Sequence, residues 1–130
     1  MPIARVADTG TGGESMLLKE GDKLLVAHRR LYDKDDVRFF IGRIEGYEAG
    51  VVKMKGHSYV RDGMSGQMIG KSEVRTKILS ISSGTLLIYQ LPDAVDLDLL
   101  RFEIAGSALS LTSGEEFTMN LTEHPHSGQL

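Results

Sequence analysis

Residues 51–61 carry the clearest alternation of side chains in this sequence. Small and apolar residues occupy every second position: Val52, Met54, Gly56, Ser58 and Val60. Basic, polar and aromatic residues occupy the positions between them: Lys53, Lys55, His57, Tyr59 and Arg61. Because successive side chains of a strand point to opposite faces of its sheet, the pattern predicts a strand with one face toward the core and a basic face outward.

The run before it, residues 37–47, is rich in β-branched and aromatic residues and has no helical period, which predicts a second strand. Gly42 and Gly46 lie inside this run. Glycines within a strand mark a sharp bend or a close approach of two backbones, which a small barrel needs at its corners. Glu48 and Gly50 then belong to the turn between the two strands, so these four residues are the predicted bend and turn positions.

The rest of the chain predicts further strands separated by turns. Strands are expected at residues 16–18, 23–31, 72–81 and 85–91, turns at 19–22, 33–36 and 82–84, and a loop at 62–70. The apolar phase of 72–81 shifts near Lys77, which indicates a bulge or a sharp bend. The continuous apolar run at 85–91 is typical of a strand that is buried on both faces.

Three short alternating segments near the C-terminus predict a β-meander at about residues 97–121. Their apolar positions are Leu100, Phe102 and Ile104, then Leu109 and Leu111, then Phe117, Met119 and Leu121. Residues 93–99, just before the meander, fit either a helical turn capped by Asp93 or an extended chain. The 130 residues therefore predict one all-β domain at 16–121, between a flexible Gly-rich arm at 1–15 and a polar tail at 122–130.

Residues 40–48, FIGRIEGYE, contain an aromatic strand residue, a glycine two positions later, and an apolar–Gly–aromatic–acidic bend. Residues 74–76, VRT, precede a short apolar strand, with Thr at the position where Gly is usual. These two motifs resemble those of the Sm and Sm-like family. Over residues 23–91 the resemblance implies a small, strongly bent Sm/SH3-like barrel of five strands, and ring oligomers that form by pairing of strand edges.

The resemblance does not extend to the RNA contact of that family. The family uses an Asn four residues after the acidic bend residue, with an aromatic or similar residue two positions before the Asn. Counted from Glu48, these positions hold Val52 and Gly50. A valine cannot form a hydrogen bond to a base and a glycine cannot stack on one, so the usual base pocket is not implied here.

Charge is distributed unevenly along the chain. The net charge is −3, but residues 23–77 contain 12 Lys and Arg against 7 Asp and Glu, and the remainder contains 3 basic and 11 acidic residues. This asymmetry indicates either a surface for an anionic partner or complementarity between basic and acidic parts of the same or a neighbouring subunit. Overall acidity weakens non-specific attraction to nucleic acid, which favours the second interpretation.

No residue pattern predicts catalysis, a metal or a cofactor. The chain has no cysteine, which excludes disulfides and thiolate chemistry, and it has no G-x-S-x-G nucleophile motif. Acidic residues at 93–103 leave open a glycosidase-like carboxylate pair, whose distance in the fold would decide the matter. His124 and His126 are metal-compatible, but ligands in a polar tail are not preorganised.

The sequence favours a non-catalytic module that self-associates into a homo-oligomer. The alternative is that RNA, single-stranded nucleic acid or another anionic ligand binds the basic face of residues 51–61, with Tyr59 stacking on a base between Lys53, Lys55, His57 and Arg61. No apolar run approaches the ~20 residues that span a bilayer, and the N-terminus has no apolar signal region. We therefore expect a cytoplasmic protein with no membrane partner.

Overall fold

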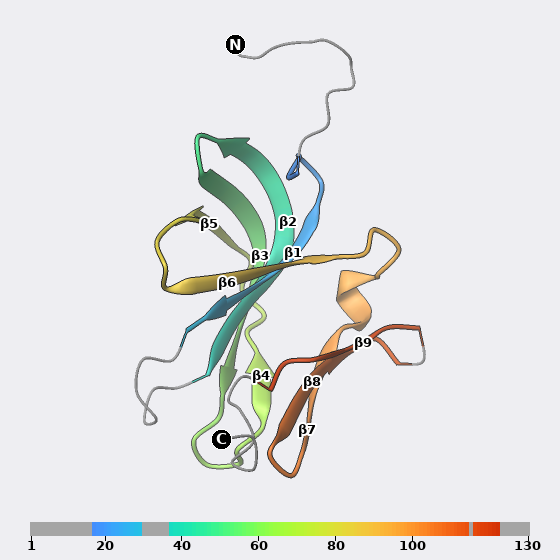
Figure 1. Cartoon of the computed structure of the whole chain (residues 1–130). Helices are drawn as coiled ribbons and strands as arrows, with labels where there is room; N and C mark the ends of the chain where they lie inside the picture. The colour runs from blue at the N-terminus through green and yellow to red at the C-terminus, as the bar shows by residue number, and fades with distance from the viewer. Residues whose placement is uncertain (1–16, 30–36, 115, 123–130) are drawn as a thin grey trace, which may run out of the picture.

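The computed structural model describes residues 17–29, 37–114 and 116–122, and they form two antiparallel sheets (Figure 1). The larger sheet consists of β1 (Lys23–His28), β2 (Arg38–Glu48), β3 (Val51–Arg61), β4 (Met68–Gly70), β5 (Arg75–Ser80) and β6 (Leu86–Leu91). The smaller sheet consists of β7 (Arg101–Ala105), β8 (Ala108–Thr112) and β9 (Thr118–Asn120). A single turn of 3-10 helix, η2 (Leu97–Leu99), lies between the two sheets in the chain. The all-β prediction and the C-terminal meander are confirmed.

The larger sheet curls but does not close. Its strands run in the order β6–β1–β2–β3, and the long β3 pairs over one part with β5 and over another with β4. Strands β5 and β6 follow each other in the chain, but within the described residues they do not pair with each other. The sheet is therefore open and not a closed barrel, and β5 and β6 flank the opening (Figure 1).

Two glycines allow β2 and β3 to bend together. Gly42 and Gly56 lie directly opposite each other across the two strands. A Cβ on Gly42 would overlap the carbonyl oxygen of Lys55, and a Cβ on Gly56 would overlap that of Ile41 and lie 2.6 Å from the Gly42 Cα atom. The backbones approach too closely here for any side chain, so the bend requires glycine on both strands.

The other predicted bend and turn positions lie further along β2 and in the hairpin that follows. Pairing with β3 shifts by one residue before Gly46, which marks a β-bulge. Glu48 pairs with Val51, and the two residues between them, Ala49 and Gly50, have φ values of +50° and +80°. A two-residue loop with positive φ at both positions is a type I′ turn, which suits the twist of the flanking strands.

Ala49 is the non-glycine residue with positive φ in the described chain, and its conformation predicts a stabilising substitution. An L-residue with a Cβ is strained in this region, whereas asparagine tolerates it and Asn-Gly is a favoured type I′ pair. We expect Ala49→Asn to raise the free energy of unfolding by about 0.5–1 kcal/mol. Urea denaturation measures the change, with Ala49→Val as the opposite control; a less stable Ala49→Asn variant would contradict the turn assignment.

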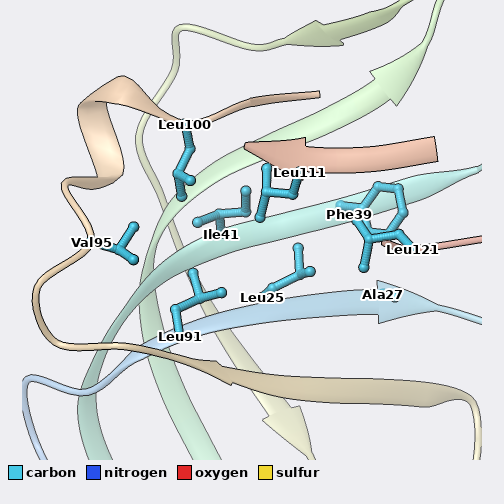
Figure 2. Close-up of a cluster of buried hydrophobic side chains, with 9 residues drawn as sticks. All are labelled: Leu25, Ala27, Phe39, Ile41, Leu91, Val95, Leu100, Leu111 and Leu121. Carbon is cyan, nitrogen blue, oxygen red and sulfur yellow. The ribbon is translucent and has the colours of Figure 1, made fainter. Parts of the chain in front are cut away.

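Strands β1 and β2 are buried on both faces because the curled sheet packs on two sides. Its concave face encloses an inner cluster: Leu24, Val26, Phe40, Ile44, Val52 and Met54. Its other face packs against the smaller sheet through an outer cluster, shown in Figure 2: Leu25, Ala27, Phe39, Ile41, Leu91, Val95, Leu100, Leu111 and Leu121. This two-sided burial explains why β1 and the first half of β2 are almost continuously apolar.

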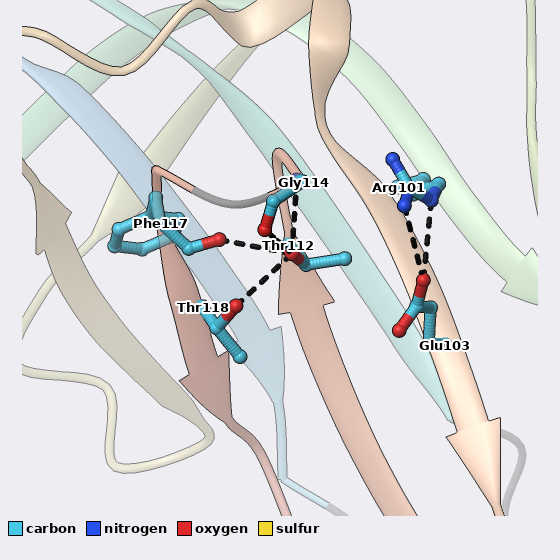
Figure 3. A network of polar contacts seen from close by, with 6 residues as sticks. All are labelled: Arg101, Glu103, Thr112, Gly114, Phe117 and Thr118. Carbon is cyan, nitrogen blue, oxygen red and sulfur yellow. Dashed lines mark hydrogen bonds and ion pairs between the residues drawn. The ribbon is translucent and has the colours of Figure 1, made fainter.

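Aromatic packing and a buried hydroxyl help to order the smaller sheet. The ring of Phe102 stacks on Phe39 of the larger sheet, with ring centroids 4.9 Å apart. The Thr112 side chain is 4% exposed and is enclosed by the β8–β9 turn (Figure 3). Its hydroxyl donates to the Phe117 carbonyl at 2.9 Å and accepts from the Gly114 N–H at 3.0 Å, so no buried polar atom of this side chain lacks a partner.

A lysine of β1 positions the link between the two sheets. The Lys23 Nζ atom donates to the carbonyl oxygens of Asp93, at 2.6 Å, and Val95. The Asp96 carboxylate then accepts from the Asp98 N–H at 2.9 Å and caps η2. Residues 93–99 therefore contain a short helical turn, and Asp96 caps it where Asp93 was the expected cap.

Asp22 is a buried carboxylate that joins the first turn to the edge strand β6. It accepts hydrogen bonds from the backbone N–H of Lys19 and its Nζ atom, both at 3.0 Å, and from Gln90 at 3.1 Å. Burial by itself would raise the pKa of Asp22, but the hydrogen bonds and charge of Lys19 outweigh it and lower the pKa below 3.8. The carboxylate is thus held ionised, and Gln90 is anchored at the edge of the sheet.

Two predictions about the ends of the larger sheet are wrong. Residues 17–18 form a bend and not a strand, because the chain there only leads into the turn before β1. Residues 62–70 contain the short strand β4 as well as a loop, since Met68–Gly70 pairs with the end of β3. The predicted strand at 23–31 ends at His28, and the predicted turn at 33–36 lies outside the described residues.

The predictions for β5 and β6 need correction as well. The pairing of β3 with β5 runs without a bulge, because Lys77 takes an inner-face position with its Nζ atom 4.7 Å from the centre of the Phe40 ring. Strand β6 sends side chains into both clusters, but only Leu91 is buried. It is an edge strand, and the opening of the sheet leaves both of its faces partly exposed.

Candidate functional site

The basic face of β3 divides into an exposed half and a packed half. Lys53 and Lys55 are exposed on the outer face of the sheet. Arg43 of β2 lies directly opposite Lys55 and is also exposed. Like charges that face each other across two strands repel, so these three cations form a surface that an anion would stabilise.

His57 and Tyr59 lie further along the same face and have structural contacts. The His57 Nδ1 atom lies 3.1 Å from the Lys71 carbonyl oxygen, to which it can donate. Tyr59 is half-buried, and its ring packs edge-on against Phe102 with centroids 5.2 Å apart. Burial raises the pKa of Tyr59, and the nearby Asp98 carboxylate raises it further. The structure thus packs Tyr59 against the smaller sheet, although it still lines one cleft together with Lys55 and His57.

Arg61 ends β3 and organises the loop that follows. Its Nε atom donates to the Gly66 carbonyl at 2.9 Å. The Asp62 carboxylate accepts from the backbone N–H groups of Met64 and Ser65, which fixes the first residues of the same loop. Arg61 therefore has a local role in the β3–β4 connection.

A cleft of about 450 Å³ lies over the bend of β2 and β3. Its charged and polar lining residues include charges of both signs: Glu20, Arg43, Glu45, Lys55, His57, Tyr59 and Asp98. An anionic ligand would meet carboxylates as well as cations here, so the cleft has no single charge preference.

A second hollow, of about 220 Å³, is basic, and the sequence patterns did not indicate it. Its polar lining residues are His28, Arg38, Ser58, Lys71, Arg75 and Lys77. They come from four separate segments of the chain and meet only because β1, β2, β3 and β5 curl around one end of the inner cluster. Each of them that lies in a strand is separated by an even number of positions from an apolar residue of the inner face, as Arg38 is from Phe40. This spacing was the signal available in the sequence.

The edges at the sheet opening expose apolar side chains. Ile78 of β5 is 70% exposed, Val74 just before β5 is 52% exposed, and Leu87 of β6 is 37% exposed. Beside β6 is a cleft of about 430 Å³ with a mainly apolar lining: Leu17, Leu18, Leu24, Tyr47, Ile81, Leu86, Ile88 and Gln90. Apolar side chains at a sheet edge favour pairing with another strand.

The described residues contain no group of three or more acidic or histidine side chains that could hold a metal ion, and His124 and His126 lie outside them. The carboxylates at 93–103 are exposed, with Asp96 used as a cap and Glu103 paired with Arg101 at 3.2 Å. In the same part of the chain, no helix has the length and apolar character needed to cross a membrane.

Comparisons with protein-family models, with curated proteins and with solved structures found no match.

Proposed function

We propose that this chain is a non-catalytic, Sm-like module that self-associates through its β5 and β6 edges. The observation that carries the proposal is the open sheet, whose two edge strands both expose apolar side chains next to the opening. The strong bend at Gly42 and Gly56 and the two motifs in the sequence support the Sm-like assignment. Edge pairing would make the oligomer a continuation of the sheet from one copy to the next.

The two edges are complementary in their side chains. When β5 of one copy lies beside β6 of the next, residues that oppose each other share a face of the sheet. In an antiparallel register that places Ile78 beside Leu87 on the outer face, Leu79 lies beside Leu86 and the apolar cleft on the inner face. Because the two edges are different surfaces, the contact is head-to-tail, and repeated copies close into a ring when the rotation allows it.

Charge does not decide this pairing. Arg75 and Lys77 of β5 lie on the inner face of the sheet, whereas the segment with aspartates at 93, 96 and 98 follows β6 beside the outer cluster. The complementarity between basic and acidic parts of neighbouring subunits therefore stays a prediction.

Size-exclusion chromatography with light scattering tests self-association directly. We expect the full chain to elute as a homo-oligomer whose mass is a whole multiple of the monomer mass and falls on dilution. A monomer at all accessible concentrations would overturn the proposal. The cytoplasmic location expected from the sequence stays a prediction.

Binding of single-stranded RNA to the outer face is the second candidate, and the cluster of Arg43, Lys53 and Lys55 favours it. We expect the double variant Lys53→Glu and Lys55→Glu to lose most of the affinity for a labelled oligoribonucleotide, with binding of the unaltered chain weakening as salt rises. Fluorescence anisotropy measures both effects. Affinity that is absent at low salt, or that is unchanged in the variant, would rule out this surface.

A further inference from the structure

The inner face of the curled sheet changes from apolar to basic along its length. Its centre is the inner cluster, and the next inner-face positions toward one end are His28 on β1, Arg38 on β2 and Lys77 and Arg75 on β5. Strand pairing confirms the shared face, since Lys77 opposes Met54 and Arg75 opposes Gly56. These cations line the basic hollow of about 220 Å³ described above, which we call the basic mouth of the open sheet.

Contacts with the sheet position two of the lysines at this mouth. The Lys77 Nζ atom lies 4.7 Å from the centre of the Phe40 ring, which keeps the half-buried lysine directed inward. The backbone N–H of Lys71 donates to the Ser58 carbonyl at 2.8 Å, which places Lys71 on the rim. Apart from Lys71, which follows β4, the polar residues of the hollow are thus strand residues that share the inner face of the sheet.

The cations repel one another. Burial lowers the pKa of Lys77, and the charges of Arg75 and Arg38 lower it further. Burial also lowers the pKa of His28, with added contributions from Arg38 and Lys77. Among the described residues, Arg75 forms the one ion pair at this mouth, with the exposed Glu73 at 2.9 Å. Charges concentrated in this way cost stability and are characteristic of functional sites.

The dimensions and donors select a small, highly charged anion. A volume of about 220 Å³ is below the roughly 300–1,000 Å³ of pockets that enclose organic ligands. Two arginines can each donate two parallel hydrogen bonds to an oxyanion, while Lys71 and Lys77 supply point charges and Ser58 a hydroxyl. We propose that this basic mouth binds a phosphate group, as inorganic phosphate or as the terminal phosphate of a small ligand.

All the residues of the mouth come from one chain, so this proposal does not depend on self-association. Isothermal titration of the full chain with inorganic phosphate, at constant ionic strength with chloride as the replaced anion, tests it. We expect saturable binding that becomes at least about 10-fold weaker when Arg38→Gln and Lys77→Met are combined. The matched control, Lys19→Gln with Arg101→Gln, removes the same charge from exposed positions outside both basic surfaces and should bind phosphate as the unaltered chain does.

The thermal midpoint without phosphate checks that the variant folds. We expect it to be unchanged or higher in the Arg38→Gln, Lys77→Met variant, because repulsion is removed, and we expect phosphate to raise it only in the unaltered chain and the control. Absence of phosphate binding, or equal binding by both variants, would overturn the proposal.

Competition separates a terminal phosphate from a nucleic-acid backbone. We expect a 5′-phosphorylated dinucleotide to displace phosphate and its unphosphorylated form to fail. If the unphosphorylated dinucleotide binds equally well and depends equally on Arg38 and Lys77, the mouth recognises phosphodiesters and the proposal of a terminal phosphate is wrong.

Discussion

Gly56→Ala is expected to destabilise the protein severely, by at least about 3 kcal/mol. The new Cβ would overlap the Ile41 carbonyl oxygen and approach the Gly42 Cα atom, so two paired strands would have to separate at the centre of the sheet. No side-chain rearrangement can relieve this overlap, because both contacts are with backbone atoms. Since small domains have only about 5–15 kcal/mol of stability, the variant should unfold at much lower urea concentration.

Gly46→Ala is the matched control for this substitution. Gly46 lies in β2, the same strand as Gly42, but a Cβ there meets nothing within 4 Å. We expect its midpoint of urea unfolding to stay close to that of the unaltered chain. Equal stability of the Gly46→Ala and Gly56→Ala variants would contradict the close crossing of β2 and β3.

The double variant Ile78→Glu and Leu87→Glu is expected to dissociate the oligomer into monomers. Both side chains are already exposed in the single chain, so the substitutions should leave its stability almost unchanged. In the proposed contact they would place two carboxylates opposite each other with little water around them. A loss of about 3 kcal/mol, or roughly 100-fold in affinity, follows from such an unpaired charge at an interface.

A charge reversal separates edge pairing from a general effect of added charge. Ile78→Glu combined with Leu87→Lys should associate more tightly than the double glutamate variant, because opposite charges then face each other. Met64→Glu with Leu99→Glu adds the same charge at exposed positions away from β5 and β6 and should leave the oligomer intact. Light scattering of the four proteins measures these differences, and dissociation by the Met64 and Leu99 control would contradict the assigned interface.

Residues with a local pattern could be placed from the sequence. Strand β3 spans residues 51–61 as predicted, because one buried face and one exposed face produce strict alternation. The meander was predictable for the same reason. Strand β4 was not, because three residues in a Gly-rich loop are too few to show a period. The position of β6 at an edge was also hidden, since its apolar run is equally compatible with a central strand.

The candidate sites depended on distant contacts that no local pattern contains. The alternation of β3 correctly places Lys53 and Lys55 outside, but the partner of Tyr59 is Phe102, which follows it by more than 40 residues in sequence. The basic mouth required the pairing of three strands before Arg38 and Lys77 could be brought together. The phase shift at Lys77 was visible in the sequence, but its cause is an inward-facing charge and not a bulge.

Hydrogen–deuterium exchange at the β5 and β6 edges tests the central claim most directly. Half of the backbone N–H groups of an edge strand face away from its partner strand, and they exchange rapidly unless another chain pairs with them. At concentrations where the protein is oligomeric, we predict slow exchange throughout Arg75–Ser80 and Leu86–Leu91, with the outward N–H groups becoming fast on dilution or in the Ile78→Glu, Leu87→Glu variant. Fast exchange of the outward N–H groups at every concentration would contradict assembly through these edges.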